Sequence, residues 1–451
     1  MGFDKLYNKE DYKSPSRSDN MMIDINEISQ KSTSGSETDF KQLPHRRKRN
    51  KVIRAIFISL TVILTIYLIG DYYGPNEIVL KKTNVFGFEG QRASELIVQD
   101  YDQNDNLYAT RGMILYKLPK GGDRFVKVAH IPTGFGVFWL RNFTLFRKFT
   151  LRPECVEVVV KPSGNVVAMS AGKLWALSAA GNDFEPTLEL THYGKGDQGI
   201  FENGILSKND STVFFGEYFR NDNREQVRVF GSYNQGKEWN VKYTFKPGEI
   251  RHIHALLKDP YEDKLWICTG DDNGEPRIAW TDDDYKTIHP IGQGSQMWRA
   301  TQLVFEKDYI YWGADTYEKD FAGIYRWHRK TQQVEKISDV DGAMFHATKL
   351  KNGMIVMNTS REGGANEKDD KIRMFVVNQK GGVQSKEMGT WEKKSGFWFK
   401  YAKLRTARGQ GASSLAMTCL MQEEFPNAEL VIIPQEQLTE EGLASAGFSA
   451  E

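Results

Sequence analysis

Two histidines stand two residues apart in a short apolar run, at His252 and His254. Residues at this spacing on a β-strand project to the same side, because successive side chains alternate between the two faces. Imidazole nitrogens bind divalent metals, and a histidine also serves as a general base. With His346 or Asp271 the pair could hold a divalent metal, or one histidine could abstract the proton next to a uronate carboxylate. Both could equally do no more than satisfy internal hydrogen bonds.

Arginines and carboxylates stand at comparable places, just before or just after apolar strands. Guanidinium groups bind carboxylate or sulfate through paired hydrogen bonds, so converging arginines would recognise an acidic ligand. Alternatively, the arginines form ion pairs with neighbours such as Glu95, Glu154 or Glu202. The candidate ligand-binding residues are Arg92, Arg152, Arg251, Gln296, Arg299, Asp315 and His346. The candidate catalytic residues are Glu217, Tyr218, His252, His254 and Asp271.

These residues belong to a repeat of about fifty residues. Each unit has an apolar strand, a polar turn, a second strongly apolar strand and two further short strands. Four short strands per repeat, without long amphipathic helical patterns, are typical of an all-β protein with the β-propeller fold. The first strand of each blade lines the central channel of a propeller, so the candidate residues would meet at one face. The units begin at Leu96, Val156, Ile205, Leu256, Leu303 and Leu350.

The pattern predicts six or seven blades. Strand-like runs at residues 413–419 and 429–433 could form the seventh, closed by a strand from residues 78–86. A pair of all-β sandwiches is the alternative, because short strands with frequent turns also suit that architecture. The regular period favours the propeller, since a sandwich does not require one.

One turn carries a recognisable motif, S-x-D-x-G-x-x-W with Asn at the Asp position. It consists of Ser232, Asn234, Gly236 and Trp239. This motif resembles the Asp-box, or BNR repeat, of sialidase-type propellers, and a degenerate copy with Tyr285 at the glycine position follows in the next unit. Asp or Asn accepts backbone hydrogen bonds in such a turn, Gly adopts a positive φ, and Trp packs against the blade. The resemblance implies a structural role for the motif and no catalytic one.

The resemblance has a second part. Residues 200–350, through blocks such as residues 251–254 and 294–299, are similar to uncharacterised BNR-like proteins of bacterial exopolysaccharide or capsule loci. Sialidases of the superfamily use an arginine trio for the substrate carboxylate, a Tyr/Glu pair and an Asp acid/base, and Glu217 with Tyr218 is the nearest counterpart here. Their Arg-Ile-Pro signature is missing near the start of the domain, so their residue roles do not transfer.

The N-terminal segment predicts a single-pass membrane anchor. Residues 1–51 are polar and poor in aromatics, which predicts a disordered tail, and residues 52–70 form a signal-anchor helix. The basic cluster before the helix places the tail in the cytoplasm, the propeller at residues 75–440 outside it, and a C-terminal tail at residues 441–451. A cleaved signal peptide is the alternative, but its charged region would be unusually long and no small-x-small cleavage pattern follows.

The amino-acid composition limits the classes of partner that the chain is expected to bind. With 60 Lys and Arg against 59 Asp and Glu, the chain has no bias toward polyanions, and no nucleic-acid partner is expected. Its three cysteines are too few for a disulfide framework. The leading hypothesis is an extracytoplasmic propeller that binds an anionic polysaccharide in envelope or exopolysaccharide handling, with no cofactor required and a divalent metal as an option. The alternatives are a glycoside hydrolase or polysaccharide lyase acting on an acidic glycan, and a protein-protein receptor or scaffold.

Overall fold

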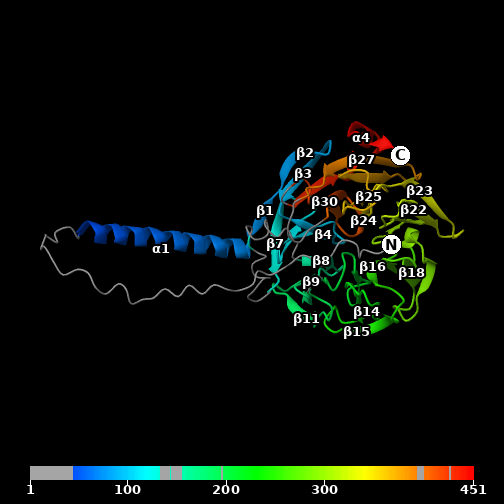
Figure 1. Ribbon diagram of the computed structural model, residues 1–451, viewed down its shortest axis with the longest axis horizontal. Coiled ribbons are helices and arrows are strands. Elements are labelled where there is room, and N and C mark those ends of the chain that lie inside the picture. The colour runs from blue at the N-terminus through cyan, green and yellow to red at the C-terminus, as the bar shows by residue number, and fades with distance from the viewer. Residues whose placement is uncertain (1–43, 133–142, 144–154, 195–196, 394–400, 426–427) are drawn as a thin grey trace, which may run out of the picture. The chain divides into compact units, whose positions relative to one another are not determined.

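The computed structural model describes residues 44–132, 143, 155–194, 197–393, 401–425 and 428–451 (Figure 1). The chain divides into two units, residues 1–63 and 64–451. The first described element is helix α1 (Pro44–Tyr73). Its stretch Lys51–Tyr73 reaches a mean hydropathy of 2.4, and the most apolar part of this stretch has no buried residues. By length and composition this helix can cross a membrane.

Helix α1 extends beyond the predicted range 52–70 at both ends. Its first turns contain Arg and Lys, which are good helix formers, so the end of the predicted tail is helical. The tail as far as residue 43 lies outside the described residues.

The described part of residues 64–451 forms a seven-bladed β-propeller, made of seven separate sheets that follow one another around a ring (Figure 1). Their strand pairs are antiparallel, except for one parallel pair in the sixth sheet. The first blade contains β4 (Ile97–Tyr101), β5 (Leu107–Arg111), β6 (Ile114–Leu118), β7 (Arg124–His130) and, at its outer edge, β1 (Glu77–Val79). The second contains β8 (Cys155–Val160), β9 (Val166–Ser170), β10 (Lys173–Leu177) and β11 (Glu185–Glu189). The third contains β12 (Ile205–Ser207), β13 (Val213–Gly216), β14 (Val227–Ser232) and β15 (Asn240–Phe245).

The later blades follow the same order. The fourth contains β16 (His252–Lys258), β17 (Leu265–Gly270), β18 (Arg277–Thr281) and β19 (His289–Gln293). The fifth contains β20 (Val304–Phe305), β21 (Tyr309–Gly313), β22 (Gly323–His328) and β23 (Val334–Asp339). The sixth contains β24 (Met344–Leu350), β25 (Ile355–Thr359), β26 (Lys371–Val377), β27 (Val383–Thr390), β29 (Gln410–Ala412) and β32 (Ser449–Ala450). The seventh contains β28 (Lys403–Thr406), β30 (Ser414–Leu420), β31 (Glu429–Pro434), β3 (Phe88–Ser94) and β2 (Lys81–Val85).

The second strand of each blade is buried on both faces, which explains its continuous apolar sequence. Every residue of β5, β9, β13, β17 and β25 is buried, whereas the outermost strands β11, β15 and β19 are largely exposed. The core is therefore divided among the spaces between consecutive blades. Between the third and fourth blades, for example, Phe214 packs in one cluster with Ile253 and Leu256. Face-to-face burial of both sides of a sheet is what produces such apolar runs.

Two ends of the chain complete the seventh blade. Strand β3 pairs with β31, and Gln91 lies opposite Ile432. An N-terminal segment thus closes the ring, but the closing strand β3 lies beyond the predicted residues 78–86, and β2, which lies within them, pairs with β3 at the outer edge. The sequence predicted that the propeller ends at residue 440, but α4 (Glu440–Ser445) and β32 pack onto the propeller. Because β32 pairs with β27 and Leu443 and Phe448 are buried, residues 441–451 are not a free tail.

The Asp-box-like turn joins β14 to β15, as expected from its sequence. The Ser232 hydroxyl accepts a hydrogen bond from Gly236 N (2.9 Å), and the Asn234 side chain accepts one from Glu238 N (2.9 Å). Gly236 has φ +86°, and the Trp239 ring packs edge-on against Phe215. These contacts fix the turn on the third blade.

The degenerate copy of this turn adopts the same hydrogen-bond pattern without a glycine. Tyr285, which stands at the glycine position, has φ +63°, and its backbone N–H donates to Thr281 Oγ1 (3.2 Å). This conformation is unfavourable for a bulky residue. The Tyr285 ring is fully buried and its hydroxyl donates to Trp266 O (3.1 Å), so packing compensates for the backbone strain.

Candidate functional site

Strands β16 and β17 bring three candidate residues together at one end of the fourth blade. His252 lies opposite Gly270, and Asp271 directly follows that glycine. The register of the two strands shifts between Ile253 and Ala255, so His254 lies in a β-bulge. Bulges redirect side chains and are common beside functional sites.

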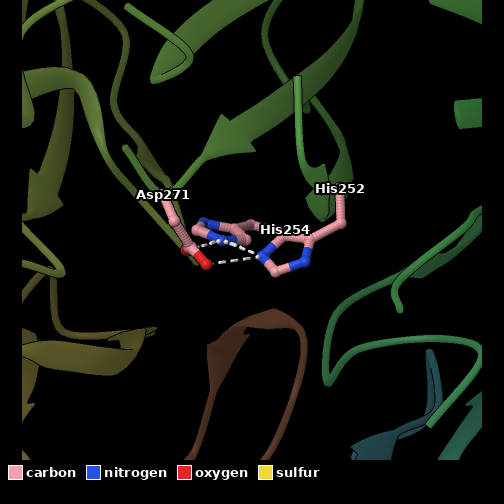
Figure 2. Close-up of side chains that lie close together, drawn as sticks. All are labelled: His252, His254 and Asp271. Atoms are coloured by element: carbon pink, nitrogen blue, oxygen red, sulfur yellow. Dashed lines mark hydrogen bonds and ion pairs between the residues drawn. The ribbon is translucent and has the colours of Figure 1, made fainter. Parts of the chain in front are cut away.

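The side chains of His252, His254 and Asp271 converge on one another (Figure 2). The two Nε2 atoms lie 3.1 Å apart. His254 Nε2 lies 3.1 Å from Asp271 Oδ1, and His252 Nε2 lies 3.3 Å from Asp271 Oδ2. The other ring nitrogens contact backbone carbonyls: His252 Nδ1 lies 3.0 Å from Phe219 O and His254 Nδ1 lies 3.3 Å from Ala300 O.

Two arginines contact the same carboxylate. Arg299 Nη2 lies 3.1 Å from Asp271 Oδ1, and Arg251 Nη1 lies 3.3 Å from Asp271 Oδ2. Each arginine also has a second acidic partner, because Arg299 Nε lies 3.2 Å from Asp315 and Arg251 Nη2 lies 2.9 Å from Asp222. The Gln296 side-chain amide also donates a hydrogen bond to the backbone carbonyl of Asp271 (2.7 Å).

Aromatic rings form one wall of this cluster. The Tyr218 ring lies over His252, with ring centroids 4.0 Å apart, and Phe201 packs against Tyr218 at 4.6 Å. Burial, together with the negative charges of Asp271 and Asp315, raises the pKa of Tyr218 well above its usual value, so the phenol stays protonated.

Electrostatic interactions shift the pKa values of the carboxyl groups in the cluster in different directions. Burial raises the pKa of Asp271, but the positive charges of a protonated His252 and of Arg299 outweigh burial and hold that pKa well below its usual range. Burial dominates at Asp315 and raises its pKa in spite of Arg299. Asp271 and Asp315, which both pair with Arg299, thus have pKa values shifted in opposite directions. Such perturbed pKa values are typical of functional sites.

A further pair, Tyr317 and Glu362, lies beside this cluster. Tyr317 donates a hydrogen bond to Glu362, and burial raises the pKa of that carboxyl to about 8. Both residues follow the second strand of a blade, β21 and β25, as Asp271 follows β17. This position predicts Glu362 at the same face as Asp271, and it is the signal that could also have identified Tyr317, which sequence reasoning missed.

Other predicted site residues lie elsewhere. Glu217 forms a bidentate ion pair with Arg228 on the neighbouring strand, so it points away from the face that Tyr218 occupies. Successive residues of an extended chain point to opposite sides, which is why the predicted Glu217 and Tyr218 pair does not form. Arg92 lies on β3, three strands out from β28, and its nearest acidic partner is Glu429 at 3.7 Å, so its predicted place at the channel is wrong. Arg152 lies outside the described residues.

His346 belongs to a separate network that crosses the centre of the ring. Its Nε2 lies 2.9 Å from Glu202, which also pairs with Lys403 (2.8 Å) and Arg405 (3.4 Å). Arg405 in turn donates to Gln99 at 3.0 Å. These side chains come from four different blades, so they fill the channel between the innermost strands. His346 therefore shares Glu202 with two cations, and the structure places Asp271, not His346, beside the other two histidines.

The fold resembles solved propellers at low sequence identity. Oligogalacturonate lyase from Vibrio parahaemolyticus matches with a TM-score of 0.53 and 11% identity, covering 81% of this chain and 98% of that chain. A GH74 enzyme from Niastella koreensis matches with a TM-score of 0.47 and 12% identity, covering 79% of this chain and 53% of that chain. No protein-family model matches the sequence, and no curated protein matches it significantly. At these identities the likeness is one of fold alone, and it places the chain among the β-propellers.

Proposed function

We propose that the propeller binds an acidic polysaccharide at the cluster around Asp271. The observation that carries this proposal is the convergence of Arg251, Arg299, His252 and His254 on one carboxylate at the channel face of the fourth blade. Guanidinium groups recognise carboxylate and sulfate by paired hydrogen bonds, and a neighbouring aromatic wall suits a sugar ring. A carbohydrate role in envelope or exopolysaccharide handling also agrees with the neighbour of TM-score 0.53, which is a lyase of oligogalacturonate, an anionic sugar.

A second candidate function is elimination on a uronate by this same site. Tyr218 lies over His252, so a phenol and an imidazole stand together where a proton next to a sugar carboxylate would be removed. Hydrolysis has less support, because it requires a pair of free carboxyl groups and Glu217 is held by Arg228. The lyase is therefore the enzymatic version to test.

Helix α1 supports the proposal that the propeller is anchored to a membrane. Lys51–Tyr73 is long and apolar enough to cross a bilayer, and basic residues 45–51 before its apolar part favour a cytoplasmic N-terminus. The propeller would then meet its glycan outside the cytoplasm. Protease protection of the full chain in sealed vesicles tests the orientation, because a propeller exposed on the cytoplasmic side would contradict it.

The glycan proposal is tested with the full chain in detergent on an array that includes uronate-containing, sulfated and neutral polysaccharides. We expect binding to acidic members only. Arg299→Gln and Arg251→Gln should each weaken that binding about tenfold or more, because a charge-assisted hydrogen bond contributes about 1.5–3 kcal/mol. Ultraviolet absorbance of an unsaturated uronate product, measured in parallel, detects elimination.

The matched control is Arg124→Gln, which removes an exposed arginine on the first blade that pairs with Glu77 and Asp123. Its glycan affinity should equal that of the wild type. Equal binding by Arg299→Gln and the wild type would refute the site, and binding to neutral glycans alone would refute the acidic ligand.

A further inference from the structure

The hydrogen atoms of the two clustered histidines can be located from their partners. Phe219 O and Ala300 O are backbone carbonyls, which only accept hydrogen bonds, so Nδ1 of His252 and Nδ1 of His254 each carry a proton. In a neutral imidazole the other nitrogen then has a lone pair. Both lone pairs point toward each other and toward the carboxylate of Asp271. Three acceptors therefore face one point.

A single proton cannot satisfy this arrangement. If His252 Nε2 were protonated, it could donate either to His254 Nε2 at 3.1 Å or to Asp271 Oδ2 at 3.3 Å. The remaining contact between His254 Nε2 and Asp271 Oδ1 would still join two acceptors. A protonated imidazole would also add a positive charge beside the guanidinium groups of Arg251 and Arg299, which already bind the same carboxylate.

We infer that His252, His254 and Asp271 form a binding site for one divalent transition-metal ion. A ligand atom from each of the three residues lies within 4.8 Å of the other two. Nitrogen and oxygen ligands that are each about 2.0–2.2 Å from an ion lie roughly 2.8–3.1 Å apart in octahedral geometry and roughly 3.3–3.6 Å apart in tetrahedral geometry. The observed separations of 3.1, 3.1 and 3.3 Å fall in these ranges.

The surrounding contacts are those of a supported metal site. Ligating histidines usually donate their second N–H to a carbonyl or carboxylate, which fixes the ring and its tautomer. Both histidines do so here. Gln296 holds the backbone of Asp271 through its carbonyl, and the bulge at His254 aims that ring inward.

The donor set indicates the class of ion. Two neutral imidazoles and one carboxylate suit Zn²⁺, Fe²⁺ or Mn²⁺, whereas Ca²⁺ and Mg²⁺ prefer oxygen ligands alone. Three protein ligands leave at least one coordination position for water or for an oxygen of a bound molecule. Zn²⁺ and Mn²⁺ are accordingly the two ions for the test.

Charge connects the ion to the glycan, a step that rests on the proposed function. Arg251 and Arg299 both pair with Asp271, so a protein carboxylate occupies both guanidinium groups. A divalent ion would add two positive charges and take over Asp271, so that the two guanidinium groups can turn to the carboxylate of the glycan.

The test uses the full chain in detergent, without a polyhistidine tag, stripped with EDTA and titrated calorimetrically with ZnCl₂ and with MnCl₂. We expect one ion per chain in the wild type and an affinity about 100-fold lower in His254→Ala and in Asp271→Asn. His289→Ala is the matched control, because His289 is exposed on the outer strand of the same blade, and it should bind like the wild type. A wild type that binds neither ion, or a His254→Ala variant that binds as tightly as the wild type, would overturn the site.

Two further measurements keep the result decisive. If His254→Ala does not fold, X-ray absorption of the Zn²⁺-loaded or Mn²⁺-loaded wild type decides, because this site requires scattering from two imidazoles. Glycan binding is then measured before and after EDTA. Metal binding without glycan binding would refute only the proposed function, whereas glycan binding that survives EDTA in a protein that binds no ion would refute only the metal site.

Discussion

The guanidinium group of Arg299 lies 3.2 Å from the carboxylate of Asp315, and the two side chains are only 17% and 4% exposed. Replacing Arg299 with Met would leave Asp315 buried without its cation. Breaking a buried pair from one side costs about 3–5 kcal/mol, so we expect Arg299→Met to lower the free energy of unfolding by about 3 kcal/mol. Urea denaturation measures the change, and the exposed Arg124→Met provides a control in which little change is expected. Equal midpoints for the two variants would contradict this prediction.

Glu362 should make the protein less stable as the pH rises. Burial raises its pKa from 4.5 to about 8, so between these values the folded chain holds a proton that the unfolded chain has released. The free energy of unfolding therefore falls with increasing pH across this window and levels off above it. At about 1.4 kcal/mol per pH unit, this contribution is about 5 kcal/mol over the whole window and about 3.5 kcal/mol between pH 5 and pH 8.

Urea denaturation at pH 5 and pH 8 tests this prediction. In Glu362→Gln the difference in stability between the two pH values should shrink by that amount, because a neutral side chain replaces the titrating one. Glu335→Gln, on an exposed strand edge, should keep the difference seen in the wild type. An unchanged difference in Glu362→Gln would show that Glu362 does not hold its proton.

Two glycines with the same backbone angle should respond differently to alanine. Gly236 has φ +86° and an added Cβ would lie 2.9 Å from Val167 of the preceding blade, whereas Gly248 has φ +88° and nothing within 4 Å. Gly248→Ala should cost about 1 kcal/mol for the conformation alone, and Gly236→Ala about 2 kcal/mol or more because of the added contact. Thermal unfolding of both variants measures the difference, and equal losses would show that the Asp-box-like turn is free to move away from its neighbour.

Glu202 should stabilise the propeller from its centre. Glu202 pairs with Lys403, Arg405 and His346 from two other blades. Burial raises the pKa of Glu202, but the charges of Lys403 and Arg405 outweigh burial and hold this pKa well below the usual value. Glu202→Gln should lower the free energy of unfolding by about 3 kcal/mol at pH 7.

This contribution depends on pH in the opposite sense to that of Glu362. A depressed carboxyl pKa stabilises the fold above the unfolded value of 4.5, and the contribution is lost as the pH falls below it. The difference between the wild type and Glu202→Gln should therefore diminish in acid. A difference that grows below pH 4 would contradict the assignment.

The fold was largely predictable because burial leaves a direct mark on the sequence. The second strand of each blade packs on both faces and reads as an unbroken apolar run, which is why the fifty-residue period could be seen. Strands β2 and β3 carry no such run, since β2 is mostly exposed and β3 is mixed. The position of Arg92 depended on knowing that β3 belongs to the last blade, which is a long-range pairing that local sequence does not encode.

The histidine pair was predictable from its spacing, although a β-bulge also directs the His254 ring. His252 and His254 were expected on one side of a strand, and their rings do meet. Glu217 and Tyr218 were expected together, but neighbours on an extended chain face opposite ways, and Arg228 on the adjacent strand holds Glu217. His346 could not be assigned, because its partner Glu202 reaches it across the channel from another blade.

The closure of the ring has a consequence measured in time. Gln91 pairs with Ile432, so strand β3 is made 341 residues before its partner. At about 5–20 residues per second, translation delivers that partner roughly 20–70 s later. During this interval β3 is an open strand edge that can pair with another chain. The ribosome's pace, as well as the final structure, thus sets how long each newly made chain is exposed to misassembly.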